Sequence, residues 1–118
     1  MASRKTNPEF MTGIPELLIL RLLSDREMYG YELVQAIQDA TGAAITLGEG
    51  VVYPILHSLE ERSCLRARSK PVNGRTRVYY TTTADGRKRL SAMIGEWKRI
   101  SSAVSSVVGG SIHATSAV

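Results

Sequence analysis

The chain lacks the features that would place it outside the cytoplasm. Its single cysteine, Cys64, excludes an intramolecular disulfide and fits a reducing compartment. No apolar run is long enough to span a bilayer, and the N-terminal residues lack the pattern of a signal peptide. We therefore predict a cytoplasmic protein that does not contact a membrane.

The chain also lacks the signatures of an enzyme. There is no phosphate-binding glycine loop, no dinucleotide fingerprint and no nucleophile–base pair. Asp85 is interpreted as a residue at a helix start, and His57, Cys64 and His113 do not have the spacing of metal ligands. We predict no catalytic residue and no metal-binding residue, and the sequence contains no evident cofactor motif.

Acidic residues are scarce in the second half of the chain. Residues 1–61 carry a net charge of −5 and residues 62–118 one of +9, which together give the overall +4. Nine of the basic residues lie between Arg62 and Arg89, where Asp85 is the only acid. This concentration of charge is expected of a protein that binds a polyanion, and a solvated basic face without a partner is the alternative.

The stretch from Gly48 to Arg62 organises the rest of the chain. Apolar residues with helical spacing predict one buried stripe: Val52, Ile55, Leu56 and Leu59. The opposite side is predicted to be exposed: Glu49, Val51, Tyr53, Pro54, His57 and Ser58. A short helix with a small tip, followed by a basic hairpin, suggests a probe helix, which inserts its first turn into a groove of a partner. A core helix with a tight entry loop is the other interpretation.

Two helices are predicted before this stretch. Residues 1–10 have no periodicity and are interpreted as a disordered arm left by expression, although a basic arm touching DNA is an alternative. The first helix is predicted to open at Thr12 or Gly13, with Pro15 in its first turn. The second begins in Tyr29-Gly30-Tyr31-Glu32 and ends at Thr41-Gly42.

A two-stranded hairpin is predicted after Cys64. Leu65, Ala67 and Ser69 alternate with Arg66, Arg68 and Lys70, and Asn73-Gly74 is typical of a tight turn. On the returning strand, Val78 and Tyr80 share one face and Arg75, Arg77 and Tyr79 the other. The hairpin therefore displays a cluster of cations.

A long amphipathic helix is predicted over residues 84–110, with Thr83 as its N-cap. Its apolar stripe comprises Leu90, Met93, Ile94, Trp97, Ile100, Val104 and Val108. A domain of 118 residues has too little core to cover this stripe, so we predict burial against a second subunit. Residues 111–118 are interpreted as a disordered tail.

These elements predict a fold that is mainly α with a small β-hairpin (α+β). The order is that of a winged helix-turn-helix over residues 11–83, followed by a dimerisation helix. The chain resembles the PadR-type transcriptional regulators from about Gly13 to Val108. The matching motifs are Tyr29-Gly30-Tyr31-Glu32, Gly48-Glu49-Gly50-Val51-Val52-Tyr53-Pro54, Gly74-Arg75-Thr76-Arg77-Val78-Tyr79-Tyr80, Thr83-Ala84-Asp85-Gly86 and Trp97.

The resemblance implies a homodimer that binds double-stranded DNA at a pseudo-palindromic operator. The implied DNA-binding residues lie in three segments: Tyr29 and Tyr31; Glu49, Gly50, Val51 and Tyr53; and Arg66, Arg68, Lys70, Asn73, Gly74, Arg75 and Arg77. For Tyr29 and Tyr31, packing of one ring in the core is the alternative. Val51 and Val52 stand where the family usually has Thr-Leu, which changes the operator contacts and not the fold.

The resemblance further implies a repressor that is released by a small-molecule or other inducer. Trp97, with Met93, is the candidate site for an aromatic effector. The alternative role of Trp97 is to anchor the core of the dimer. A divalent metal effector is less favoured than an aromatic one. The predicted dimerisation residues are Leu17, Leu90, Ile94, Ile100 and Val104. A winged helix that binds protein instead of DNA is the alternative function.

Overall fold

The helices and strands follow one another in the predicted order, with one added strand. The computed structural model describes residues 2–109, with side chains from Gly13 onward. The elements are α1 (Ala2–Asp25), β1 (Met28–Tyr29), α2 (Gly30–Ala40), α3 (Glu49–Glu61), β2 (Leu65–Val72), β3 (Arg75–Thr82) and α4 (Ala84–Val107). The predicted α+β class, a winged helix-turn-helix with a long last helix, is confirmed.

Helix α1 begins earlier than predicted. It starts at Ala2, so the structure places residues 2–10 in a helix and not in a disordered arm, and Pro15 lies inside the helix instead of in its first turn. The physical reason is that the costly step is the first helical turn. Once the apolar part of α1 is formed, each further residue adds a hydrogen bond at little cost.

The core lies where α1, α2 and α3 meet the inner face of the sheet. Its fully buried side chains include Leu20 of α1, Leu33 of α2 and Leu56 of α3. The sheet contributes Leu65 and Tyr80, and α4 adds Leu90. Helix α3 therefore sits on the core through the predicted stripe, which fixes its orientation.

The hairpin of β2 and β3 forms the wing, and β1 joins its edge. The three antiparallel strands lie in the order β1-β3-β2, and Tyr29 pairs with Tyr79. Asn73 and Gly74 at the turn have φ angles of 52° and 76°, as the predicted Asn-Gly turn requires. The third strand was not predicted, because two residues are too few to show an alternating pattern.

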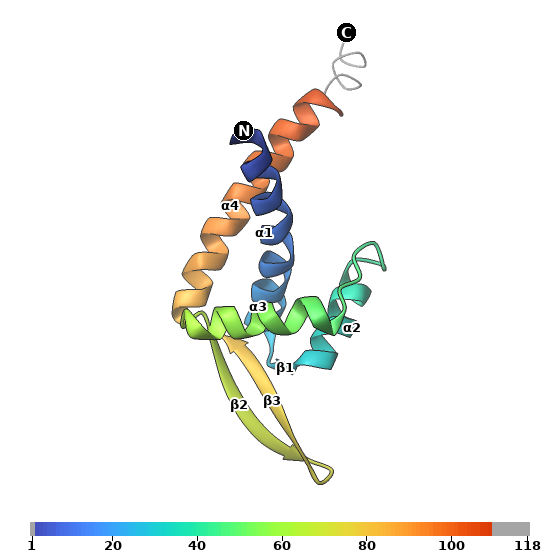
Figure 1. Ribbon diagram of the computed structural model, residues 1–118, viewed down its shortest axis with the longest axis vertical. Coiled ribbons are helices and arrows are strands. Elements are labelled where there is room, and N and C mark those ends of the chain that lie inside the picture. The colour runs from blue at the N-terminus through green and yellow to red at the C-terminus, as the bar shows by residue number, and fades with distance from the viewer. Residues whose placement is uncertain (1, 110–118) are drawn as a thin grey trace.

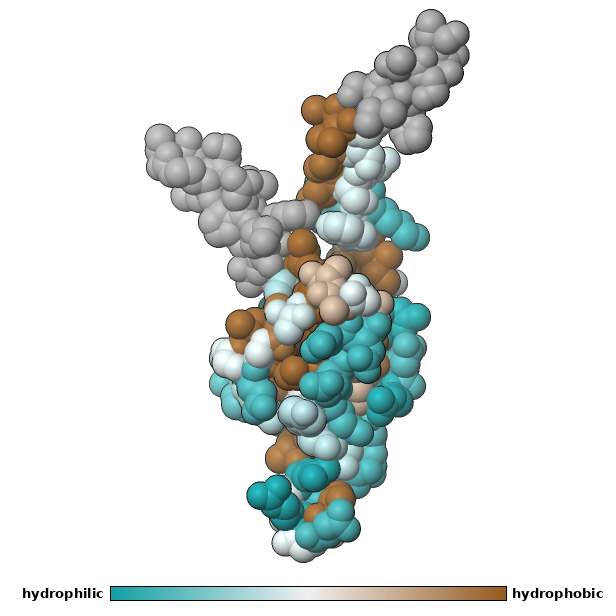
Figure 2. All heavy atoms as spheres, turned by 90° about the vertical axis from the view of Figure 1, so that its right-hand side faces the viewer, coloured by the Kyte–Doolittle hydropathy of each residue, from teal (hydrophilic) through white to brown (hydrophobic). Residues whose placement is uncertain are grey.

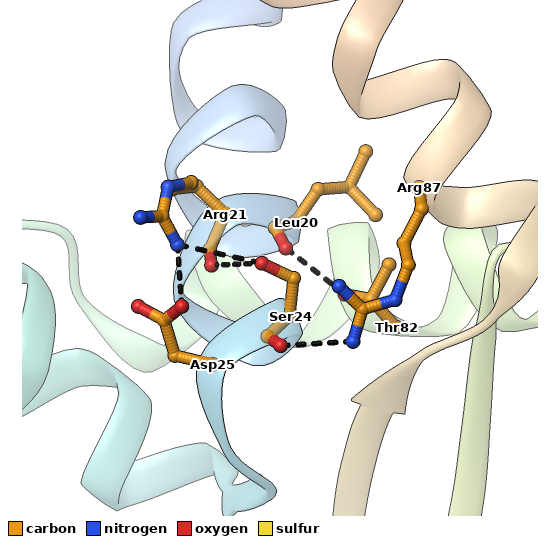
Figure 3. A network of polar contacts seen from close by, with 6 residues as sticks. All are labelled: Leu20, Arg21, Ser24, Asp25, Thr82 and Arg87. Carbon is orange, nitrogen blue, oxygen red and sulfur yellow. Dashed lines mark hydrogen bonds and ion pairs between the residues drawn. The ribbon is translucent and has the colours of Figure 1, made fainter.

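The end of α1 is tied to the point where the wing meets α4 (Figure 3). The Thr82 hydroxyl donates to the Leu20 carbonyl at 2.9 Å, and the Arg87 guanidinium donates to the Ser24 carbonyl at 2.9 Å. Thr83 caps α4 as predicted, because its hydroxyl accepts from the Gly86 N–H at 3.0 Å. The bonds from Thr82 and Arg87 hold the base of the wing and the start of α4 against α1.

Helix α4 then runs away from the wing beside α1 (Figure 1). It ends at Val107, slightly before the predicted boundary, and the predicted tail of residues 111–118 lies outside the described residues. Figure 2 shows hydrophobic residues along its far part, where Val104, Val107 and Val108 are exposed, and Trp97 is exposed nearer the middle of the helix. In the part of the chain that the structure describes, no helix is long and apolar enough to cross a membrane.

Candidate nucleic-acid interface

The first turn of α3 is exposed while the rest of the helix is anchored. Gly48 precedes the helix, Glu49 and Gly50 are exposed, and the Val51 side chain is 46% exposed. Of the predicted stripe, Val52, Leu56 and Leu59 are fully buried, and Ile55 is half-buried against the core. The stripe is therefore part of the core, whereas the exposed first turn is compatible with the probe interpretation and leaves it a prediction.

Tyr53 does not lie on the exposed side of α3, where the periodicity had placed it. Its ring is half-buried and packs against the backbone of Gly30 at the start of α2. The periodic pattern failed here because Gly30 has no side chain, which leaves room for the ring. Packing of the ring beside α2 restricts how the Tyr53 hydroxyl could approach a phosphate.

The two tyrosines at the start of α2 have different surroundings. The Tyr31 side chain is 52% exposed. Tyr29 is half-buried, and its ring contacts Tyr79 edge-on with the ring centroids 5.4 Å apart. Tyr29 is therefore packed against the wing, and of the two Tyr31 is the one open to solvent.

The register of the hairpin gathers the predicted cations on one face. Arg66, Arg68 and Lys70 of β2 stand opposite Thr81, Tyr79 and Arg77 of β3, and Val72 stands opposite Arg75. Directly opposed residues in an antiparallel pair point to the same side of the sheet. The basic face of the wing thus comprises Arg66, Arg68, Lys70, Arg75 and Arg77, and its other face begins in the core at Leu65 and Tyr80.

Three of these cations already have partners within the chain. The Arg68 guanidinium donates to the Glu27 carboxylate at 3.0 Å, and the Lys70 ammonium forms an ion pair with the same carboxylate. Lys70 also lies 4.2 Å from the ring centroid of Tyr79, and Arg77 lies 4.3 Å from that of Tyr29. The pattern of charges did not predict these contacts, because Glu27 and Tyr29 belong to the segment before α2 and are distant from the wing in sequence.

The remaining basic residues of the wing are placed differently. Arg66 and Arg75 are exposed, and within residues 13–109 neither forms an ion pair. Arg75 follows the exposed turn residues Asn73 and Gly74 at the tip of the wing. Arg75 is therefore an exposed basic residue beside the tip of the wing.

Figure 1 shows how the two parts of the interface are arranged. The wing forms one end of the molecule, α3 crosses directly beside it, and α4 runs to the opposite end. The structure therefore brings the tip of α3 and the basic wing to the same end of the fold. The predicted effector and dimerisation residues in the far part of α4 belong to the other end, whereas Leu90 lies near the start of α4.

Most of the predicted residues at that other end lie on α4. Trp97 is 41% exposed and Val104 53% exposed, whereas Met93, Ile94 and Ile100 are half-buried. Leu90 is buried in the subunit's own core, and Leu17 packs against that core from α1. Of the predicted dimerisation residues, Leu90 is thus already used within the subunit.

No cluster of metal ligands is found in the described part of the chain, where no three His, Cys, Asp or Glu side chains come together to hold an ion. Cys64 is buried and His57 is exposed on α3. The third residue considered from the sequence, His113, lies outside the described residues.

Comparison with known proteins matches both the sequence and the fold. A model of the transcriptional regulator PadR-like family matches residues 19–92. The crystal structure of smu.1704 from Streptococcus mutans UA159 is 31% identical, with a TM-score of 0.74, and the match covers 84% of this chain and 90% of that one. A PadR-like transcriptional regulator from Bacillus cereus (BC4206) is 27% identical, with a TM-score of 0.71 over 85% and 96% of the two chains.

A curated relative agrees with these matches. The transcriptional regulator YqjI of Escherichia coli is 39% identical over 61 residues, which are 52% of this chain and 30% of YqjI. The residues of the family match include α2, α3 and the whole wing, so they contain the interface described above. The chain therefore belongs to the PadR-like family of transcriptional regulators, which bind DNA and are not enzymes.

Proposed function

We propose that the chain is a homodimeric repressor that reads a roughly palindromic operator and is released by an inducer. The observation that carries this proposal is the shared position of the exposed α3 tip and the basic wing at one end of the fold. A helix presented end-on beside a basic hairpin can enter a major groove while the hairpin contacts the flanking backbone.

The roles of the interface residues follow from their exposure. Glu49, Gly50 and Val51 stand nearest the bases, and the exposed Val51 methyl groups suit contact with a thymine methyl. The exposed Tyr31 would donate its hydroxyl to a phosphate. Arg75 at the wing tip contacts phosphates or a minor groove, with Asn73 and Gly74 allowing close approach.

The far part of α4 supports the homodimer. Val104, Val107 and Val108 leave an apolar surface exposed (Figure 2), and burial of such a surface at about 25 cal/mol per Å² favours association. Ile94 and Ile100 extend this surface toward the wing. Two subunits joined through α4 would present two α3 helices to successive major grooves, which is why the operator is expected to be palindromic.

Trp97 is the proposed contact for an inducer. Its indole is partly exposed on α4 with Met93 one turn earlier, and it lies beyond the residues matched by the family model. A flat aromatic compound could stack on this ring, and its binding would change how the subunits pack. The alternative, an indole that only anchors the dimer, predicts no fluorescence change with any such compound.

Fluorescence anisotropy tests the proposal. The protein is titrated into the DNA upstream of its own gene and into a scrambled duplex, each over a series of salt concentrations. Nanomolar binding to the first duplex that weakens steeply with salt is expected, because Arg75 and its neighbours displace counterions from phosphates.

A protein-binding winged helix is the second candidate. The exposed valines on both the wing and α3, Val78 and Val51, are what favours it, because apolar surface of this kind also suits a protein partner. A well-folded dimer that binds no duplex at low salt would support this function over DNA binding.

A further inference from the structure

Glu27 is a carboxylate that faces the basic side of the wing from the segment between α1 and β1. It accepts from Arg68 at 3.0 Å and forms an ion pair with Lys70. The side chains of Glu27, Arg68 and Lys70 are 28%, 64% and 36% exposed, so the cluster lies at the surface. An anion from solution can therefore reach the same two cations.

The backbone fixes Glu27 at this place. Tyr29 of β1 pairs with Tyr79 of β3, and residues two apart along an extended segment point to the same side of a sheet. Glu27 consequently shares the side of Tyr29, where Arg68 and Lys70 also lie. The hydrogen bond from Lys70, with the charge of Arg68, lowers the pKa of Glu27, so the carboxylate is ionised at neutral pH.

We propose that Glu27 is a specificity-determining residue for DNA binding, because its carboxylate occupies Arg68 and Lys70 until α3 is seated in its operator. On unrelated DNA the wing then binds phosphate without Arg68 and Lys70, through Arg66, Arg75 and Arg77. In the operator complex, contacts made by α3 bring the backbone against the wing, and phosphates replace the carboxylate. This inference rests on the proposed function.

Replacement of the Glu27 carboxylate by a phosphate requires little free energy. An ion pair at the surface contributes little to stability, so a phosphate held close by other contacts can replace the carboxylate. A loosely bound duplex lacks those contacts and does not. Glu27 thus weakens binding to unrelated DNA more than binding to the operator, and widens the ratio between them.

Glu27→Gln tests this inference through the salt dependence of binding to unrelated DNA. Each newly engaged phosphate adds about 0.9 to the slope of log K against log salt, and two freed cations raise the affinity on the order of ten-fold. The operator duplex should gain much less affinity and keep its slope. An unchanged slope and affinity for unrelated DNA would overturn the inference.

Two further variants sharpen the test. Glu96→Gln is the matched control, since Glu96 pairs with Arg99 at 2.5 Å on α4 and loses the same charge away from the wing. It should change neither slope. Arg68→Gln combined with Lys70→Gln should leave the affinity for unrelated DNA unchanged, lower that for the operator, and abolish the effect of Glu27→Gln. Loss of affinity for both duplexes would contradict the proposal.

Different results would contradict the proposed function and the role of Glu27. If the parent protein binds neither duplex at low salt, the proposed function fails and this inference fails with it. If the parent protein discriminates between the duplexes and Glu27→Gln leaves the discrimination intact, only the role of Glu27 is wrong.

Discussion

The ring of Tyr53 packs so closely on Gly30 that a Cβ atom at residue 30 would lie 2.4 Å from the Tyr53 Cζ and Oη atoms. The contact joins α3 to the first residue of α2. This contact explains why Tyr53 is half-buried although it lies off the apolar stripe. With the Tyr53 ring in this place, only glycine fits at residue 30.

Gly30→Ala should therefore destabilise the fold. The added methyl group must push the Tyr53 ring aside, and such overpacking costs about 1–3 kcal/mol. Urea denaturation measures the change. In a Tyr53→Ala background the same substitution should cost much less, because the clashing ring is gone; an equal cost in both backgrounds would show that the ring is not the cause.

Gly86→Ala should be more damaging still. A Cβ at residue 86 would lie 2.1 Å from the Cys64 carbonyl oxygen, which belongs to the backbone and cannot rotate away. The loss should exceed the roughly 1–3 kcal/mol of ordinary overpacking. Gly95→Ala in the same helix is the control, because a Cβ there meets nothing within 4 Å and alanine favours helix. Similar melting temperatures for the two variants would refute this explanation.

Thr82→Val should remove the bond that joins β3 to α1. The Thr82 hydroxyl is buried and donates to the Leu20 carbonyl, so the substitution is expected to cost about 1–2 kcal/mol in denaturant melts. Thr81→Val is the matched control, because Thr81 is the neighbour on the opposite face of the sheet. A cost as large at Thr81 would mean that strand propensity, and not the hydrogen bond, is being measured.

Arg75→Gln should weaken DNA binding without changing stability. Arg75 is exposed at the wing tip, and loss of one phosphate contact should reduce the salt slope by about 0.9. Anisotropy titrations over a salt series check this. Arg21→Gln removes an equal charge from an exposed ion pair with Asp25 on α1, 2.6 Å apart, and should leave the slope unchanged.

The Glu27 cluster should make stability depend on pH on the acid side. The folded-state pKa of Glu27 lies below its ordinary value of 4.5, so the folded state holds fewer protons in that range and stability rises with pH. The contribution is complete above pH 4.5 and disappears as the pH falls through the folded pKa. The stability difference between the parent and Glu27→Gln should shrink over this window; a constant difference would argue against the ion pair.

Periodicity predicted the elements that depend on local patterns. The stripe of Val52, Leu56 and Leu59 and the alternation from Leu65 to Lys70 each repeat within one element, and Asn73-Gly74 sets the register of the hairpin. These features determine the position of α3 and the basic face. They were therefore accessible without the structure.

The contacts that modify the interface were not accessible in this way. Tyr53 is half-buried because of a missing side chain on a different helix, and Glu27 reaches Arg68 across 41 positions of sequence. Pairing of Met28 and Tyr29 with β3 is equally non-local. A single sequence carries no signal for such contacts, since each partner taken alone fits a loop or an exposed surface.

The short strand β1 also has a mechanical consequence. Its last residue, Tyr29, is paired with the wing, and the next residue, Gly30, contacts the ring of Tyr53 from α3. Force applied to the wing is thus transmitted through two adjacent residues to α3. We therefore expect the hairpin and α3 to move together, so that a displacement of the wing would also reorient α3.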